Sequence, residues 1–190
     1  MKTAIILHGK PGKEEYYSDA YPSASNSHWL PWLQKQLLIK DIAAHTPEVP
    51  NAWNPVYETW RKEFERYEIT PETILVGHSC GGGFIVRWLS EHPDAIVGKV
   101  VLVAPSLGID WEHHGFFDFS IDLGLVSRTA GVMIFGSDND KPGITESIKQ
   151  YREVIKDAKY REFKGYGHFT LKHMGTVEFP ELLGEVLHEQ

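Results

Sequence analysis

The sequence predicts a three-layer α/β/α sandwich around a mostly parallel, six-stranded sheet, and three observations support this prediction. Six short apolar segments recur along the chain. They lack the polar alternation of half-exposed strands, so both of their faces should be buried, as in a parallel sheet. Segments suited to helices separate them, and such alternation is typical of doubly wound α/β proteins.

The expected strands and helices can be placed in order along the chain. The strands are residues 4–7, 42–44, 73–76, 99–103, 131–135 and, with a weaker apolar pattern, 160–163. The helices are residues 29–38, 55–67, 82–90, 144–157 and 177–188. Pro31 suits the first turn of the first helix, where a missing N–H loses no hydrogen bond. Residues 12–27 and 106–129 are expected to be loops.

The order of the strands in the sheet follows from the handedness of their connections. Right-handed crossovers with one reversal of direction place the first and third strands side by side. Open α/β sheets bind their ligands at such a switch point. The loops after these two strands, residues 8–12 and 77–81, should therefore face each other.

Length and composition favour one globular domain over residues 1–190. The chain has 42% hydrophobic and 24% charged residues, which are ordinary values for a folded domain. Its formal net charge is -7, and its lysines and arginines form no basic cluster. Nucleic acid is therefore not an expected partner, and a small neutral substrate fits better than a polyanion.

The cysteine content and the apolar runs indicate the compartment. Cys80 is the only cysteine, which excludes an intramolecular disulfide and a cysteine-based zinc site and favours a reducing environment. The first apolar run is too short for a signal peptide, and no 18 apolar residues occur in succession. We expect a cytoplasmic protein without membrane contact, and the oligomeric state stays open.

Residues 77–81 match the nucleophile-elbow pattern G-x-S-x-G. An expected strand precedes them and an expected helix follows, which is the context that this motif requires. Glycines allow the chain to turn sharply there, and the helix N-terminus faces any negative charge that develops. The alternative is a glycine-rich turn with an ordinary serine. The flanking elements favour Ser79 as a nucleophile.

Three consecutive glycines at residues 81–83 are unusual at the start of a helix, because each costs about 1 kcal/mol relative to alanine. Close packing of the helix on the sheet, or space for a substrate, would account for them. A phosphate-binding loop is rejected, because no Gly-Lys-Ser or Gly-Lys-Thr follows.

A serine nucleophile needs a base and a third group that orients the base. His168 lies in a glycine-flanked loop after the last expected strand, and it completes the chain order Ser, Asp, His. Asp138 and Asp140 both follow the fifth strand. Either could accept the imidazole N–H, while the other would serve a turn or a helix cap.

Two backbone N–H groups are candidates for an oxyanion hole. One belongs to Cys80, the residue after the nucleophile. The other lies after the first strand, where Pro11 has no N–H and Lys10 is the candidate. A simple tight turn explains this second segment equally well. No cofactor is expected for such chemistry.

Residues 110–114 carry weaker signals. They include His113 and His114, but adjacent residues rarely point at one ion, so we expect no metal site. Aromatic side chains in this region either cover the mouth of the site or fill the core; they are Trp111, Phe116, Phe117 and Phe119.

Taken together, residues 4–9, 28–33, 76–79, 136–140 and 167–169 resemble the retinoblastoma-binding-protein-nine and YdeN family of small serine hydrolases. The resemblance covers most of the chain and implies a minimal α/β-hydrolase fold without a large cap domain. It places the catalytic triad on Ser79, Asp140 and His168. In that family the acid directly precedes a proline, whereas Lys141 intervenes here, so Asp138 stays an alternative.

The resemblance implies a serine hydrolase that cleaves small esters, thioesters or amides through an acyl-enzyme. The alternative is a non-catalytic protein-binding module on a hydrolase scaffold. Such a module would be expected to lose one of the three residue types, and all three are present. Residues 12–27 are longer than the usual first loop of the family, which leaves the substrate open.

Overall fold

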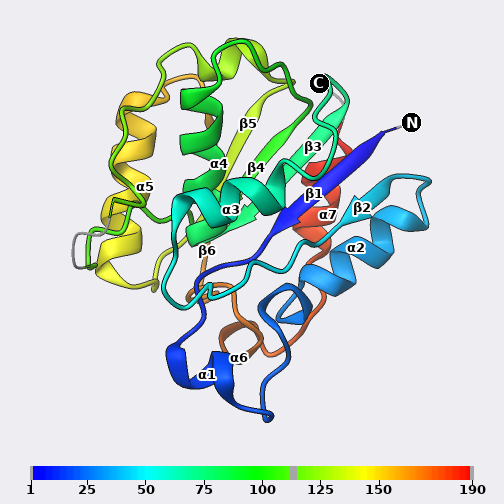
Figure 1. The fold of residues 1–190 in the computed structure, drawn as a ribbon, viewed down its shortest axis with the longest axis vertical. Coiled ribbons are helices and arrows are strands. Elements are labelled where there is room, and N and C mark those ends of the chain that lie inside the picture. The colour runs from blue at the N-terminus through cyan, green and yellow to red at the C-terminus, as the bar shows by residue number, and fades with distance from the viewer. Residues whose placement is uncertain (1, 112–114, 189–190) are drawn as a thin grey trace.

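The computed structural model describes residues 2–111 and 115–188. Its six strands form one sheet in the order β2-β1-β3-β4-β5-β6, and every neighbouring pair is parallel (Figure 1). The strands are β1 (Thr3–Leu7), β2 (Ala43–His45), β3 (Thr73–His78), β4 (Val100–Val103), β5 (Val132–Ser137) and β6 (Lys159–Phe163). The expected sheet, including the pairing of the first and third strands, is confirmed.

The central strands owe their positions to uninterrupted apolar runs. All residues of β3, β4 and β5 are buried, as expected for parallel strands covered on both faces. β6 lies at the edge of the sheet and exposes most of its residues, which explains its weaker apolar pattern. β3 and β5 each extend two residues beyond the expected end, to His78 and Ser137.

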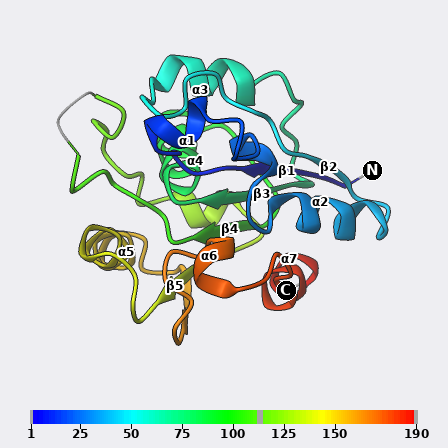
Figure 2. The same ribbon diagram turned by 90° about the horizontal axis from the view of Figure 1, so that it is seen from below.

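Helices cover both faces of the sheet. In Figure 2, α3 and α4 lie above the sheet, and α2 and α7 lie below it. The helices are α1 (Lys13–Tyr17), α2 (Leu30–Leu38), α3 (Tyr57–Phe64), α4 (Cys80–Glu91), α5 (Pro142–Val154), α6 (Leu171–Met174) and α7 (Pro180–Leu187). Among the described residues, no helix is long and apolar enough to cross a bilayer.

Several boundaries differ from the expectation. Helix α3 is shorter than residues 55–67, and α7 begins at Pro180 because proline suits the first turn of a helix. The expected loops contain short helical turns: α1 and a 3-10 turn at Ala24–Asn26 lie in residues 12–27, and Leu125–Arg128 forms a second 3-10 turn. Helix α6 was also not expected.

The glycines around Ser79 allow α4 to lie directly against the sheet. A Cβ atom at Gly77 would lie 2.6 Å from the Cα of Gly82, and one at Gly81 would lie 2.5 Å from the carbonyl oxygen of His8. Both distances are well inside van der Waals contact. Close packing of backbone on backbone therefore accounts for the glycines at the start of α4.

We expect Gly77→Ala to lower the free energy of unfolding by about 1–3 kcal/mol, because the new methyl group must push α4 away from β3. The matched control is Gly184→Ala in the exposed part of α7, where a new Cβ meets no atom within 4 Å. That variant should gain about 0.5–1 kcal/mol. Urea unfolding of the three proteins checks both signs, and a stable Gly77→Ala protein would contradict the packing argument.

Candidate active site

Ser79 lies on the sharp turn between β3 and α4. Its backbone has φ 52° and ψ -115°, a strained conformation for a residue with a side chain. The surrounding chain holds it: the Ser79 N–H donates to the carbonyl of Val103 at 2.9 Å, and its own carbonyl accepts from the N–H groups of Ser106 and Gly83 at 3.0 and 3.1 Å. The sequence-predicted elbow is therefore present in the structure.

His168 lies between Ser79 and Asp140. Its Nε2 is 2.9 Å from the Ser79 Oγ, and its Nδ1 is 3.0 Å from each carboxylate oxygen of Asp140. The Asp140 side chain is 1% exposed and that of His168 is 12% exposed. A carboxylate that accepts from Nδ1–H leaves Nε2 free to accept the serine proton, which is the arrangement that a serine nucleophile needs.

Asp138 has a different environment. It is exposed, and its Oδ1 accepts the backbone N–H of Gly165 at 2.8 Å. Its carboxylate therefore ties one loop to another, as a turn aspartate does. Of the two candidate acids, the structure brings Asp140 against the His168 ring.

The loop after β5 and the loop after β6 are joined by a series of hydrogen bonds, which we call the inter-loop ladder. Besides the Asp138 bond, the Asn139 Oδ1 accepts the N–H of Gly167 at 2.8 Å, and the Ser137 Oγ accepts the N–H of Tyr166 at 3.0 Å. Sequence reasoning assigned no role to Ser137 or Asn139. The run of polar residues directly after a buried strand is the signal that could have found them.

The loops that carry the two N–H groups expected to form an oxyanion hole, those of Cys80 and Lys10, approach each other. A Cβ atom at Gly9 would be 3.2 Å from the Cβ of Ser79, so the loops after β1 and β3 do face each other, as expected. Cys80 is the first residue of α4, where backbone N–H groups have no partner within the helix. Among residues 2–111 and 115–188, neither the Cys80 nor the Lys10 N–H has a hydrogen-bond acceptor.

The environment of the Cys80 side chain disfavours the thiolate form. It is fully buried, and burial raises the pKa of its thiol well above the usual value, an effect that the charge of Lys10 only partly opposes. A neutral thiol is a poor nucleophile. The Lys10 ammonium lies over the ring of Trp111, 5.4 Å from its centre.

The aromatic residues after β4 all belong to the core or pack against it, in line with the core-filling expectation. Phe116 is buried in the core, whereas Trp111, Phe117 and Phe119 are partly buried against it. The rings of Trp111 and Phe117 lie 5.2 Å apart. His113 and His114 lie outside the described residues. Within the described part of the chain, no group of three or more side chains could hold a metal ion.

Two buried histidines make stability depend on pH. Burial lowers the pKa of His8 and lowers that of His78 further, so both stay neutral in the folded protein. In the unfolded chain both bind protons below the ordinary histidine pKa of about 6.5. The unfolded state then holds more protons, so the free energy of unfolding falls by about 1 kcal/mol per histidine for one pH unit below that value.

Urea unfolding of the wild type at about pH 7.5 and about pH 5.5 measures this loss. The His78→Gln variant, which cannot titrate at position 78, should lose about 1 kcal/mol less between these two conditions. An equal loss in both proteins would show that His78 is not a buried neutral histidine.

Comparison with known proteins places this chain in a family. The family model described as "Serine hydrolase" matches residues 19–186. A Bacillus subtilis (strain 168) protein described as "Putative hydrolase YdeN" is 38% identical over 179 residues, which cover 88% of this chain and 91% of that protein.

Solved structures agree with the fold. The B. subtilis ydeN gene product superposes with a TM-score of 0.80 and 26% identity, over 97% of this chain and 96% of its own. Est1E of Butyrivibrio proteoclasticus, with ferulic acid bound, has a TM-score of 0.65 at 13% identity over 98% and 86% of the two chains, and shows the fold alone. The chain therefore belongs to the serine hydrolase family and has an α/β-hydrolase fold.

Proposed function

We propose that this protein is a carboxylesterase-like serine hydrolase that cleaves small esters, thioesters or amides through an acyl-enzyme on Ser79. One observation carries the proposal. The Ser79 Oγ, the His168 ring and the Asp140 carboxylate are linked by contacts of 2.9 and 3.0 Å at the carboxyl edge of the sheet. Hydrolase membership rests on the family match, whereas the roles of these three residues are inferred from their geometry.

In the proposed mechanism the Ser79 Oγ attacks the carbonyl carbon of the substrate, and its proton passes to the Nε2 of His168. Asp140 holds the imidazole in the required tautomer and stabilises its positive charge. The N–H groups of Cys80 and Lys10 bind the oxyanion of the tetrahedral intermediate.

His168 then returns the proton to the leaving group, which departs as an alcohol, thiol or amine and leaves the acyl group on Ser79. A water molecule gives a proton to His168 and attacks the acyl carbon. The second intermediate collapses to a carboxylic acid and free Ser79, with the proton returned to the serine oxygen. None of these steps requires a cofactor. We also propose that the substrate is a small molecule and that the protein acts in the cytoplasm.

A fluorophosphonate probe tests the proposal directly. We expect one covalent label per chain, on Ser79, because only an activated serine attacks phosphorus rapidly. Labelling should persist in EDTA. A series of p-nitrophenyl esters of increasing chain length, assayed beside aminoacyl amides, then identifies the acyl group. A folded protein that is not labelled and hydrolyses none of these substrates would favour the alternative, a non-catalytic binding module. Its resemblance to the retinoblastoma-binding-protein-nine branch would then extend to the fold and not to the activity.

A further inference from the structure

Two histidine side chains that are not part of the Ser79–His168–Asp140 triad form hydrogen bonds with the main chain of His168, one with its carbonyl oxygen and one with its N–H. The Nε2 of His78 lies 2.8 Å from the carbonyl oxygen of His168, and the N–H of His168 donates to the Nδ1 of His173 at 3.2 Å. We propose that His78 and His173 are positioning residues that fix the base for proton transfer from Ser79. This inference rests on the proposed function.

The loop around His168 needs such ties, because its own backbone is strained. Gly167 has φ 49° and Phe169 has φ 53°, so the residues directly before and after His168 both adopt left-handed conformations. For Phe169, which carries a side chain, this conformation is unfavourable by about 1 kcal/mol or more. Hydrogen bonds from outside must therefore determine where the His168 ring lies.

His78 links the base to the nucleophile. It is the last residue of β3, directly before Ser79, and it is buried. The carbonyl of His168 can only accept, so the Nε2 of His78 carries the proton and donates. Burial and the nearby charge of His168 lower the pKa of His78, so it stays neutral even when the base takes up a proton. One uncharged ring thus connects the end of β3, which carries Ser79, with the main chain of His168.

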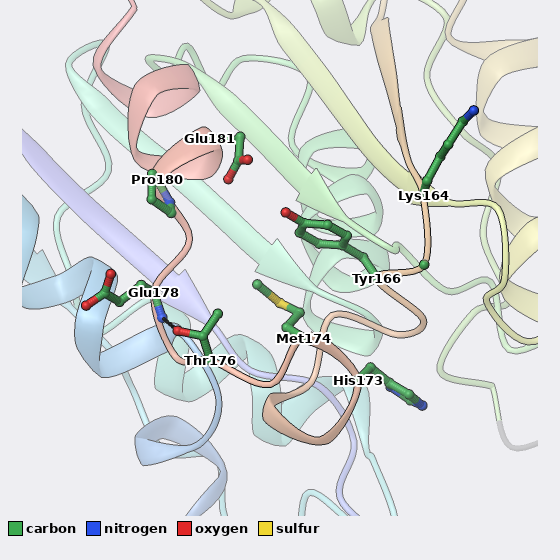
Figure 3. Close-up of a pocket in the computed structure, with 9 residues that line it drawn as sticks. Lys164, Tyr166, His173, Met174, Thr176, Glu178, Pro180 and Glu181 are labelled. Carbon is green, nitrogen blue, oxygen red and sulfur yellow. Dashed lines mark hydrogen bonds between the residues drawn. The ribbon is translucent and has the colours of Figure 1, made fainter.

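His173 holds the opposite side of the peptide chain. It lies in α6, and its Nδ1 also contacts the Thr170 Oγ1 at 2.9 Å. A Cβ atom at Gly167 would be 2.6 Å from the His173 ring, so the ring lies directly on the glycine beside the base. His173 borders a hollow of about 300 Å³, and Figure 3 shows its ring turned away from Tyr166 and Met174. The contacts of the His173 ring are therefore with the loop around His168, and the ring does not point into the hollow.

A third histidine supports the other two. The Nδ1 of His28 accepts the N–H of Leu171 at the start of α6, at 3.3 Å, and its ring packs edge-on against His78 at 5.8 Å. Burial lowers the pKa of His28 as well, an effect that the charge of Glu15 partly opposes. Residues before α2, at the end of β3 and in α6 therefore meet around the base.

The test separates the hydrogen bonds from bulk packing. His78→Gln keeps a donor at the reach of Nε2, and His173→Asn keeps an acceptor at the reach of Nδ1, whereas the two leucine variants remove these groups. The measurements are kcat and KM for p-nitrophenyl acetate and the melting temperature. We expect each leucine variant to lose up to about 10²-fold in kcat with KM little changed, as for a displaced catalytic group. The glutamine and asparagine variants should regain most of that loss.

His92→Leu is the matched control. His92 is half-buried, stacks on Trp88 at the far end of α4 and touches no residue of the site, so its removal should leave kcat unchanged. His173 is exposed, so its variants should fold even if His78→Leu does not. Wild-type kcat in a folded leucine variant, or equal losses in His173→Leu and His173→Asn, would overturn the proposal. A wild type without turnover or fluorophosphonate labelling would instead overturn the proposed function.

Discussion

The Ser79→Ala variant is expected to lose about 10⁶-fold in kcat on any ester that the wild type cleaves, the loss found when a serine hydrolase is deprived of its nucleophile. The stability of the folded protein should not change. The Ser79 side chain caps no helix N–H, and alanine places a Cβ at the same strained φ of 52°. The melting temperature should therefore stay near that of the wild type while turnover and fluorophosphonate labelling disappear.

Ser106→Ala is the control for this prediction. Ser106 is also buried, and its N–H bonds to the carbonyl of Ser79, but its hydroxyl accepts from the N–H of Gly108 and faces no base. Its kcat should stay within about tenfold of the wild type, with a loss of stability of about 1 kcal/mol. A Ser79→Ala protein with substantial activity would place the nucleophile on another residue.

The Asp140→Asn variant is expected to lose up to about 10⁴-fold in kcat, because an amide in place of the carboxylate favours the wrong imidazole tautomer. The Asp140 side chain is almost fully buried and contacts the Nδ1 of His168 with both carboxylate oxygens. Replacing the carboxylate also leaves the protonated imidazole of the transition state without a counter-charge. Steady-state kinetics on one ester, with the melting temperature, measure both effects.

Asp138→Asn is the matched comparison, two residues away in the same loop. Asp138 is exposed, and its carboxylate accepts the N–H of Gly165, to which an asparagine Oδ1 can bond equally well. Its kcat should stay within about tenfold of the wild type. If Asp138→Asn loses its turnover and Asp140→Asn keeps it, the acid has been assigned to the wrong residue.

The sheet could be predicted from the sequence because burial on both faces leaves a clear pattern. Residues 100–103 read Val-Val-Leu-Val, and all four are buried in β4. Expected and observed strands agree within one or two residues. The short helices α1 and α6 could not be predicted in this way. With five and four residues, neither contains a repeat of apolar positions, and contacts such as the Tyr16 hydroxyl accepting the N–H of Asn51 hold them from outside.

The proposed nucleophile and the proposed base could be singled out from local pattern and chain order, but the choice between the two candidate acids could not be settled. Asp138 and Asp140 follow the same strand, and both carboxylates lie within reach of the loop after β6. Only the inter-loop ladder, which pairs Asp138 with Gly165 and brings Asp140 to His168, tells them apart. The histidines around the base were missed for a related reason: His28, His78 and His173 come from three segments that meet only in the fold.

The inter-loop ladder requires that the loops after β5 and β6 change together, both in evolution and in protein engineering. Side chains at 137–139 bond to successive backbone amides at 165–167, so the two loops form a single module although the bonded residues stand 27 to 29 positions apart in the chain. An insertion in one loop would misalign every rung and withdraw Asp140 from His168. A loop graft between relatives must therefore move both segments together. The loops after β1 and β4 contribute no bond to the ladder, so changes there should leave the pairing of Asp140 with His168 intact as long as the Lys10 N–H and the Ser106–Ser79 hydrogen bond are kept.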